Sequence, residues 1–442
     1  MEQEQSDINI QHAAHALSQC ITLETVAGNT AAFEEMHAVL CRSFPLIFQQ
    51  AHIQRVNTHA MLLSLQGSRA EQPLLFIGHM DVVPVSQGSS DEWVYPPFSG
   101  MVAEAFVWGR GAIDMKGHLI ALLEALEGLL QSGFQPVRDI LIALSADEEI
   151  RGTDASSMFR ILKARGVRPV FVLDEGMGIM EGRWGMTKPM AMIGVGEKGF
   201  ANLTITASST GGHCAYPPTI TALEKAIRAA ANVTRLPLGM KHVSPALAHM
   251  LAALVPHLPK GFRRFAFARA GLFRSYVISL FEKDDFDRAF LMTTVALTAA
   301  RGSAALNALP EKASITINCR LIQGDNVNRL KKRVMARIKH DDVQIDATEL
   351  ADPSRVSPAS GAPWNALVTA IAIHYPGAVP LPTLVLGASD ARRYEGLCDH
   401  IYRFSPFMLP PDELKSKHGI NERLSLENLE IGIQFFRQML QV

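Results

Sequence analysis

Cysteine is scarce in this sequence, and no two cysteines are spaced as a Cys-x-x-Cys pair. An odd number of scattered thiols argues against a disulfide framework and a thiolate zinc site, and it fits a reducing cytoplasm. Cys214 follows His213, but no third orienting group accompanies them, so we disfavour a nucleophilic cysteine. The five cysteines are Cys20, Cys41, Cys214, Cys319 and Cys398.

Long hydrophobic runs and an excess of charge are also absent. The most apolar stretch, 119–130, is shorter than the ~18 to 20 residues of a bilayer-spanning helix, and Glu124 and Glu127 interrupt it. The net charge is -1, and the short basic run 329–333 is typical of a solvated helix face. We therefore expect no nucleic-acid partner and no membrane partner. The N-terminus has no signal-peptide pattern, so we expect a cytoplasmic protein.

With 442 residues, the chain is too long for one ordinary hydrophobic core, and we expect at least two domains. In its first part, apolar strands alternate with helical patterns, which is typical of an α/β fold with a parallel sheet. Helices are predicted within 8–48, 117–132 and 155–164, and strands at 61–65, 74–78, 139–145 and 169–173.

The pattern changes near residue 195. Residues 201–207 alternate between apolar and polar, as in an antiparallel strand with one wet face. The stretch 240–297 is apolar and basic and is predicted to be mostly helical. We therefore predict an α/β catalytic domain with a parallel or mixed sheet, interrupted by a smaller α+β domain. The predicted boundaries are 1–195 and 351–442 for the catalytic domain and 196–350 for the insertion. Further predicted elements are helix 221–233, strand 313–321, helix 326–338 and helix 426–440.

The stretch 74–84 combines a buried strand with a histidine and an aspartate at its end. Side chains on a strand alternate in direction, so His79 and Asp81 point the same way. Asp81 can accept the second ring N–H of His79, which makes the other nitrogen a better metal ligand. The pair alone is a weak metal signal, and the motifs that follow strengthen it.

Carboxylates follow two further apolar strands in the same way. Asp147, Glu148 and Glu149 follow one of them, and three successive carboxylates cost stability unless a cation compensates them. A solvated acidic loop is the alternative. Asp174 and Glu175 follow the next strand.

Two more motifs complete the set. The glycine-rich stretch 109–117 lacks the Gly-Lys-Ser/Thr of a phosphate-binding loop, so we interpret Asp114 within it as a bridging ligand. His418 lies in a polar loop before the last predicted helix. Ligands bind at the carboxyl ends of strands in open parallel sheets, so these motifs converge on one crevice. Two histidines and several carboxylates suit two zinc ions ~3.5 to 4 Å apart better than magnesium, although cobalt or manganese can use the same ligands.

The ordered series of motifs resembles the di-zinc metallopeptidase family of aminoacylase, acetylornithine deacetylase and glutamate carboxypeptidase. The series is His-x-Asp, Gly-Arg-Gly-x-x-Asp-Met-Lys-Gly, Asp-Glu-Glu, Leu-Asp-Glu-Gly and His-Gly-x-Asn-Glu, and it covers nearly the whole chain. The runs 387–394 and 401–406 look most like the carboxypeptidase S branch. That branch includes animal secreted enzymes that act on N-fatty-acyl amino acids.

The resemblance implies two zinc sites that share one carboxylate. The implied ligands are His79, Asp114 as the bridge, Glu149, His418 and either Asp174 or Glu175. Adjacent strand residues face opposite ways, so only one of the last two can point at the metal, and we favour Glu175. Glu148 would be the general base, which takes a proton from the bridging water and returns it to the leaving amine. Asp81 would orient His79.

In the inserted domain, the resemblance implies a role in dimerisation or as a lid, and in substrate binding. His213 would reach the partner subunit's site and stabilise the oxyanion of the tetrahedral intermediate. Asn307 and Arg320 match the family's substrate-binding pair in order, and Arg392 can hold the substrate carboxylate in a bidentate fork. Cys214 stands where serine is common, and the long insert diverges, which leaves the substrate preference open.

We therefore predict a homodimeric zinc hydrolase that cleaves the amide bond to a C-terminal amino acid in small peptides or N-acyl amino acids. One alternative is an aminopeptidase or dipeptidase of the same family, which would recognise a free amine. The other is a catalytically silent binding protein, which we disfavour because Glu148, Asp114 and both histidines are present.

Overall fold

A computed structural model describes residues 8–69, 71–86, 88, 90–235, 241–338 and 342–442. Residue 240, the first of the predicted helical stretch, lies outside these ranges, as do residues 1–7. The chain divides into two compact units, which we call the larger and the smaller unit. The larger unit comprises Met1–Val195, Ser357–Pro382 and Ser389–Val442, and the smaller unit comprises Gly196–Val356 and Thr383–Ala388.

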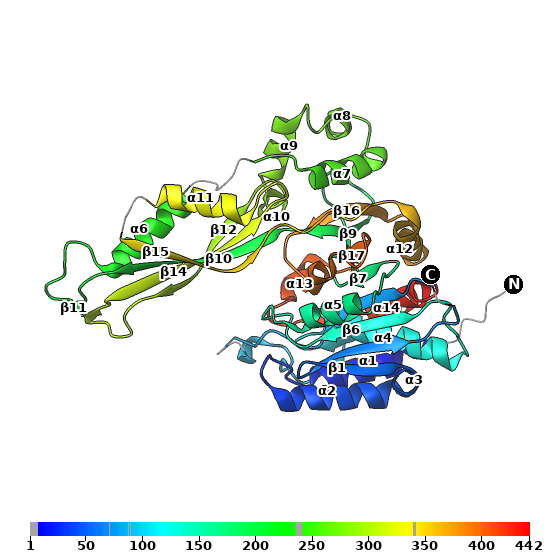
Figure 1. The fold of residues 1–442 in the computed structure, drawn as a ribbon. Coiled ribbons are helices and arrows are strands. Elements are labelled where there is room, and N and C mark those ends of the chain that lie inside the picture. The colour runs from blue at the N-terminus through cyan, green and yellow to red at the C-terminus, as the bar shows by residue number, and fades with distance from the viewer. Residues whose placement is uncertain (1–7, 70, 87, 89, 236–240, 339–341) are drawn as a thin grey trace. The chain divides into compact units, whose positions relative to one another are not determined.

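The larger unit is built on a mixed sheet with the strand order β1-β2-β6-β3-β7-β17-β9-β16, and β8 pairs with β9 (Figure 1). Strands β6, β3, β7 and β17 are parallel to one another, whereas β1 and β2 pair antiparallel at one edge. The strands are β1 (His52–Val56), β2 (Ala60–Leu65), β3 (Leu74–His79), β6 (Ile140–Ser145), β7 (Val172–Asp174), β8 (Ile179–Met180), β9 (Met190–Glu197), β16 (Val379–Val385) and β17 (Ile401–Arg403). A separate small sheet has the order β18-β5-β4 and consists of β4 (Val102–Ala103), β5 (Phe106–Trp108) and β18 (Arg423–Ser425).

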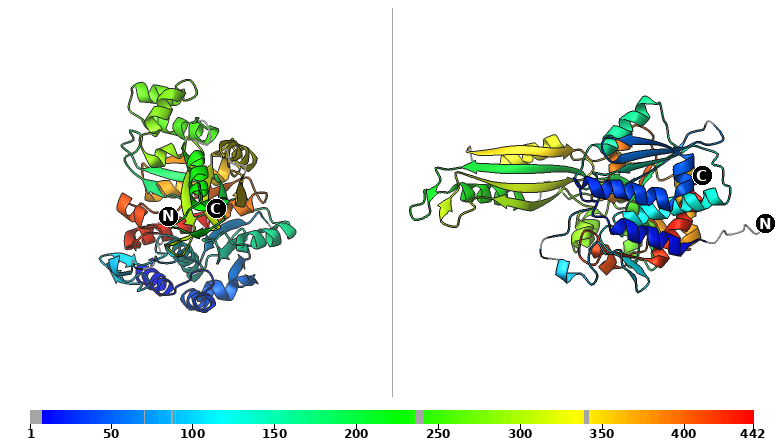
Figure 2. Two further views of the ribbon diagram at one scale, coloured as in Figure 1. Left: turned by 90° about the vertical axis from the view of Figure 1, so that its left-hand side faces the viewer. Right: turned by 90° about the horizontal axis from the view of Figure 1, so that it is seen from below.

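Helices cover both faces of the large sheet, which explains why β3 is apolar up to its last residue, His79 (Figure 2). Leu74 and Phe76 pack into a core with helices α1, α4 and α14, whereas Leu75 and Ile77 pack on the opposite face with α5. This alternation is the expected geometry of a strand buried on both sides. The helices of this unit are α1 (Ile10–Ile21), α2 (Thr30–Ser43), α3 (Pro45–Gln50), η1 (Ser90–Glu92), α4 (Lys116–Gln131), α5 (Asp154–Ala164), α12 (Gly361–His374), η3 (Asp390–Tyr394), α13 (Pro411–Ser416) and α14 (Leu426–Met439).

The smaller unit contains an antiparallel sheet in the order β12-β14-β10-β15, with α6 and α11 packed against one face. Leu203 and Ile205 point into this core, while Asn202 and Thr204 face the other side, as the alternating sequence predicts. The strands are β10 (Gly199–Ser208), β12 (Thr294–Arg301), β14 (Lys312–Leu321) and β15 (Val343–Ala351), and a short pair is formed by β11 (Gly212–His213) and β13 (Ala308–Leu309). The two helices are α6 (Ala222–Thr234) and α11 (Val327–Arg337).

The long insert is helical over most of its described length but not at its end. Its helices are α7 (Pro245–Leu254), η2 (Val255–His257), α8 (Phe262–Ala268), α9 (Arg274–Phe281) and α10 (Asp285–Arg288). The prediction of helix up to residue 297 is wrong at its end, because β12 begins at Thr294 and pairs with β14. The β-branched residues Thr294 and Val295 suit such a strand.

Among the described residues, no helix is both long enough and apolar enough to cross a bilayer. All five cysteines are free thiols.

Candidate metal centre

The strands that end in predicted site residues are neighbours in the sheet of the larger unit. Strand β3 lies between β6 and β7, and His79 at its end is in register with Ser145 at the end of β6. Asp174 ends β7, and Glu148 and Glu149 lie in the turn after β6. These carboxyl ends meet at the edge of the sheet where ligands bind in open parallel sheets.

Asp114 lies between two histidines in this cluster. Its Oδ1 is 3.2 Å from Nε2 of His79, and its Oδ2 is 2.8 Å from Nε2 of His418. Oε1 of Glu175 is 3.6 Å from the same His79 nitrogen, and Oε1 of Glu149 is 3.0 Å from the His418 nitrogen. Asp114 therefore belongs to two groups of potential metal ligands, one with His79 and Glu175 and one with Glu149 and His418.

Of the two carboxylates after β7, Glu175 lies in this cluster and Asp174 does not. Oδ1 of Asp174 accepts a hydrogen bond from the Glu175 amide at 2.8 Å, and its Oδ2 accepts one from the Ala391 amide at 2.9 Å. Burial, followed by the negative charges of Glu175 and Asp390, raises the pKa of Asp174 to about 8. The geometry thus favours Glu175 over Asp174 as a ligand, for the reason that neighbouring strand residues face opposite ways.

Asp81 is fully buried, and its carboxylate holds the turn after β6. Its Oδ1 accepts a hydrogen bond from the Glu148 amide at 3.2 Å, and its Oδ2 accepts one from the Glu149 amide at 2.9 Å. Nδ1 of His79 lies 2.9 Å from the main-chain oxygen of Asp81 and 3.4 Å from its carboxylate. The sequence predicts an aspartate side chain that orients His79. In the structure, both the main-chain oxygen and the carboxylate of Asp81 lie near His79, with the main-chain oxygen closer, and the carboxylate also positions the two glutamates.

Glu148 lies beside His79, and these two residues form a third potential ligand group with Glu149. Burial raises the pKa of Glu148 well above its usual range, and the negative charges of Asp390 and Glu175 raise it further against the opposing effect of His79. A carboxyl group whose pKa is raised is better suited to accept a proton and release it again than an ordinary carboxylate is.

The electrostatics of the cluster favour cations. Hydrogen bonds to Asp114 and Glu149 raise the pKa of His418 to about 10. Burial opposes the charged form of His79, but its hydrogen bond to Asp114 and the other carboxylates around it outweigh burial and raise its pKa well above the usual range. The negative charge gathered at this sheet edge therefore needs compensation by protons or by other positive charges.

Lys417 supplies one such charge, although it is not among the site residues predicted from the sequence. Its Nζ is 2.9 Å from Oδ2 of Asp114 and 3.4 Å from Oε2 of Glu175. No periodicity signals this contact, although Lys417 directly precedes His418 in the sequence. Two imidazoles and several buried carboxylates that attract an ammonium group in this way are a donor set that fits divalent metal ions such as zinc.

Arg110 and Glu422 form an ion pair that contacts the loops of Asp114 and His418. Neither residue was among the predicted site residues. Oε1 of Glu422 accepts hydrogen bonds from the amides of Ile113 at 3.0 Å and Asp114 at 3.1 Å, and its Oε2 is 2.6 Å from Nη1 of Arg110. Nη2 of Arg110 donates to the main-chain oxygen of His418 at 3.3 Å. This buried ion pair thus joins the loops that carry Asp114 and His418. Both residues belong to the quoted motifs, which is the signal that could have identified them.

Three predicted site residues lie in the smaller unit, and the structure brings only two of them together. His213 in β11 pairs with Ala308, and the amide of Cys214 donates to the main-chain oxygen of Asn307 at 3.3 Å. His213 and Asn307 are exposed. Arg320 lies at the opposite end of β14, where its Nε donates to Asn318 at 3.0 Å.

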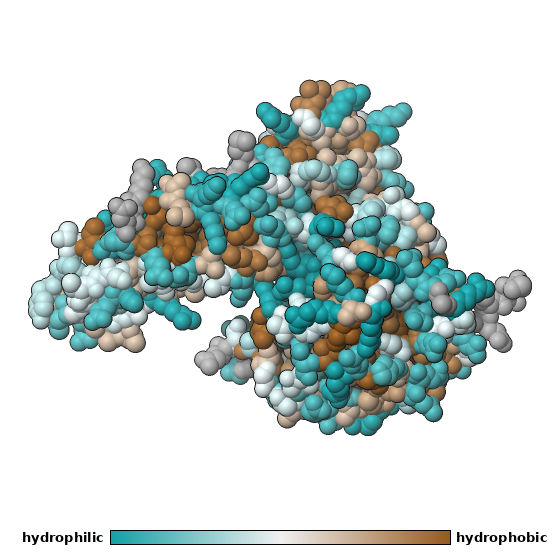
Figure 3. Space-filling model, in the orientation of Figure 1, coloured by the Kyte–Doolittle hydropathy of each residue, from teal (hydrophilic) through white to brown (hydrophobic). Residues whose placement is uncertain are grey.

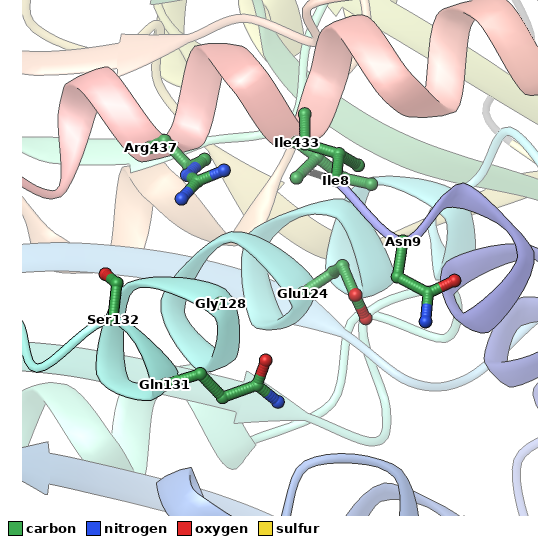
Figure 4. Close-up of a pocket in the computed structure, with 8 residues that line it drawn as sticks. All are labelled: Ile8, Asn9, Glu124, Gly128, Gln131, Ser132, Ile433 and Arg437. Carbon is green, nitrogen blue, oxygen red and sulfur yellow. The ribbon is translucent and has the colours of Figure 1, made fainter. Parts of the chain in front are cut away.

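Arg392 belongs to η3 of the larger unit and is partly exposed. The same short helix contains Asp390, which accepts a hydrogen bond from the Ser145 hydroxyl at 2.6 Å, so η3 is anchored at the end of β6. A cavity of about 180 Å³ lies elsewhere in this unit, beside α4 and α14, and no predicted site residue lines it. Figure 4 shows Glu124 and Arg437 among its lining side chains.

Comparison with known proteins assigns this arrangement to a family. Residues 75–442 match the family model described as Peptidase family M20/M25/M40. The chain belongs to this peptidase family. It is 32% identical to the N-fatty-acyl-amino acid synthase/hydrolase PM20D1 of Bos taurus over 96% of this chain and 86% of the relative. It is 30% identical to the probable carboxypeptidase S-like 2 of Dictyostelium discoideum over 99% and 85% of the two chains.

The fold agrees with this assignment. The M20 family metallo-carboxypeptidase Sso-CP2 from Sulfolobus solfataricus matches with a TM-score of 0.72 over 97% of this chain and 98% of that structure, at 14% identity. The resemblance stated from the motifs and the predicted fold class are therefore confirmed. As a member of this peptidase family, the chain is a metal-dependent hydrolase of the metallopeptidase or amidohydrolase type.

Proposed function

We propose that this chain is a zinc hydrolase that cleaves the amide bond to a C-terminal amino acid in N-acyl amino acids or small peptides. The observation that carries the proposal is the pair of ligand groups that share Asp114, with Glu148 beside them. The substrate class is supported by the relatives described as an N-fatty-acyl-amino acid synthase/hydrolase and as a carboxypeptidase S-like protein.

His79 and Glu175 would hold one zinc ion, Glu149 and His418 would hold a second, and Asp114 would contribute to both sites. Zinc, when bound, lowers the pKa of water and polarises a carbonyl group. Cobalt or manganese can replace zinc with the same donor set.

The proton transfers fall to Glu148. It takes a proton from the water that attacks the scissile carbonyl carbon, and it returns that proton to the amine nitrogen as the C–N bond breaks. The carboxylate of Asp81 binds the backbone of Glu148 and Glu149, so it fixes the base relative to a neighbouring ligand. Asp81 is therefore a positioning residue for the base.

The substrate contacts are proposed for both units. Arg392 would hold the substrate carboxylate as a bidentate fork, and Arg320 and Asn307 would bind its polar groups. Exposed His213 would donate a hydrogen bond to the oxyanion in the partner subunit's site, which requires a homodimer formed through the smaller unit.

A matched substrate panel tests the proposal. The full chain, loaded with zinc or treated with a chelator, is incubated with N-acetyl-leucine, N-lauroyl-leucine, leucyl-leucine and N-acetyl-leucyl-leucine. The proposal predicts chelator-sensitive release of leucine from the N-acylated compounds. Hydrolysis restricted to the compound with a free amine would instead establish an aminopeptidase or dipeptidase. No turnover by a chain that retains about two zinc ions would support a silent binding protein.

A further inference from the structure

Helices α8 and α9 of the smaller unit expose large apolar side chains. Phe262 is 57% exposed, Phe265 is 46% exposed, and Leu272 in the turn between the helices is 78% exposed. The same two helices also have an inward side, where Phe267 and Phe281 are buried. The exposed apolar residues are therefore not part of the core that holds these two helices together.

The two exposed phenylalanines form one aromatic cluster with two partly buried neighbours, and Leu272 directly precedes one of these, Phe273. Phe262 contacts Phe273 and Tyr276 with ring centroids 5.7 and 5.0 Å apart, and Phe265 contacts Phe273 at 5.3 Å. We call this set the aromatic tip, and it consists of Phe262, Phe265, Leu272, Phe273 and Tyr276. A joined apolar surface of this kind on a soluble unit indicates an interaction site more than scattered single residues do.

All charged residues in the sequence around the aromatic tip are basic. Between residues 260 and 281 the sequence has five basic residues and no acidic one, although the whole chain has a net charge of -1. The guanidinium of Arg269 lies 4.4 Å from the centre of the Phe265 ring. The basic residues are Lys260, Arg263, Arg264, Arg269 and Arg274.

Acidic residues resume only after α9, and two of them have basic partners. Glu282 forms an ion pair with Lys241, and Asp285 forms one with Arg288 at 2.9 Å. Figure 3 shows hydrophobic side chains at α8 and α9 among hydrophilic ones.

We propose that the aromatic tip binds peripherally to an anionic lipid surface. Phenylalanine and leucine side chains enter the boundary between headgroups and acyl chains, while arginine and lysine side chains contact the lipid phosphates. The expectation of no membrane partner rested on the absence of a spanning segment and on the net charge, and peripheral binding requires neither a spanning helix nor a high net charge.

Vesicle co-sedimentation of the full chain tests this proposal. The vesicles contain phosphatidylcholine alone or phosphatidylcholine with phosphatidylserine. The proposal predicts partition onto the anionic vesicles, with weaker partition at high salt. Two charge reversals, Arg269→Glu and Arg274→Glu, should reduce partition at least about tenfold. Phe262→Ser with Phe265→Ser should reduce it to a similar extent, about tenfold.

Matched control variants distinguish lipid binding by the aromatic tip from lipid binding by any basic or apolar surface. Helix α11 also carries a basic run, but its sequence contains no aromatic residue, so Arg329→Glu with Lys332→Glu should leave partition unchanged. Ile373→Ser removes an exposed aliphatic residue from the larger unit and should also have no effect. Vesicle partition is compared only for variants whose unfolding midpoint equals that of the unchanged chain.

Three outcomes would overturn the proposal. The first is partition that depends neither on lipid charge nor on the tip, which equal partition onto both vesicles or equal losses in the tip and control variants would show. The second is loss of dimers in the tip variants without loss of lipid binding, which would make the tip a contact between two copies. The third is equally tight, tip-dependent binding to duplex DNA, which would mean general polyanion binding.

Discussion

The two units use their sheets in opposite ways. In the larger unit both sheet faces are covered, and polar site residues gather where parallel strands end, with Asp114 2.8 Å from His418 and 3.2 Å from His79. In the smaller unit α6 and α11 pack against one sheet face, side chains on the other face are partly exposed, and the predicted substrate residues are dispersed. His213 and Asn307 are exposed at one end of the sheet, and Arg320 lies at the other.

The difference indicates which functions one unit can assemble alone. Parallel topology forces strand ends together, so a ligand cluster follows from the fold of the larger unit. The antiparallel sheet of the smaller unit does not bring its polar residues together in this way. We therefore expect its exposed polar residues to act only when a substrate or another subunit contacts them. We therefore expect changes in the larger unit to affect metal binding and chemistry, and changes in the smaller unit to affect catalysis without affecting metal.

The largest effect is expected for Glu148→Gln. Because the amide cannot accept the proton, turnover should fall about 10³- to 10⁴-fold while the zinc content stays constant. Steady-state kinetics together with metal analysis measure both quantities. Glu181→Gln, on an exposed loop, is the control. Turnover within tenfold of the unchanged chain would remove Glu148 from the mechanism.

His213→Ala should lower turnover about 10²- to 10³-fold, because one oxyanion donor is lost, and it should leave zinc binding unchanged. His249→Ala changes another exposed histidine of the smaller unit and serves as the control. Mixing His213→Ala with Glu148→Gln should restore activity through hybrid dimers, each with one intact site. Absence of recovery despite demonstrated subunit exchange would refute the action of His213 across subunits.

Glu422→Gln should weaken zinc binding about 10- to 100-fold, because Glu422 positions the backbone of Asp114 and pairs with Arg110. Turnover at saturating zinc should change less than zinc affinity. Competition with a zinc-sensitive dye measures the affinity, and exposed Glu430→Gln is the control. Unchanged affinity in a folded Glu422→Gln chain would contradict the positioning role.

The smallest effect concerns the acid stability of the larger unit. Burial, followed by the charge of Arg55, lowers the pKa of His37 to about 4, and its Nε2 donates to the main-chain oxygen of His59 at 2.8 Å. Because the unfolded chain binds the proton more readily, stability is present above the unfolded pKa of 6.5 and is lost as the pH falls toward 4. The expected loss is about 1.4 kcal/mol per pH unit in that window.

Urea unfolding at pH 7.5 and 5.5 measures this loss for the unchanged chain and for His37→Gln, which does not titrate. Between pH 7.5 and pH 5.5 the unchanged chain should lose more stability than His37→Gln. An equal pH dependence in both would show that His37 does not contribute to acid sensitivity.

Much of the candidate site follows from the sequence, because its residues come at the ends of recognisable apolar strands. The alternation of strand residues predicted that only one of Asp174 and Glu175 faces the metal, and the structure places Glu175 in the cluster. Contacts between residues far apart in the chain were not predictable in this way. Glu422 pairs with Arg110, and Lys417 pairs with Asp114, only in the folded topology. Arg110 and Glu422 belong to recognised motifs, but no local pattern predicts either contact. The start of β12 was missed because its register is set by pairing with β14.

The most direct test of the account is the zinc stoichiometry of the full chain, measured by calorimetric titration after metal removal. We expect two zinc ions per chain, and we expect Asp114→Ala to weaken the binding of both, since both ligand groups contain Asp114. Binding of one ion per chain, or loss of only one of two ions in Asp114→Ala, would contradict a centre built on a shared carboxylate.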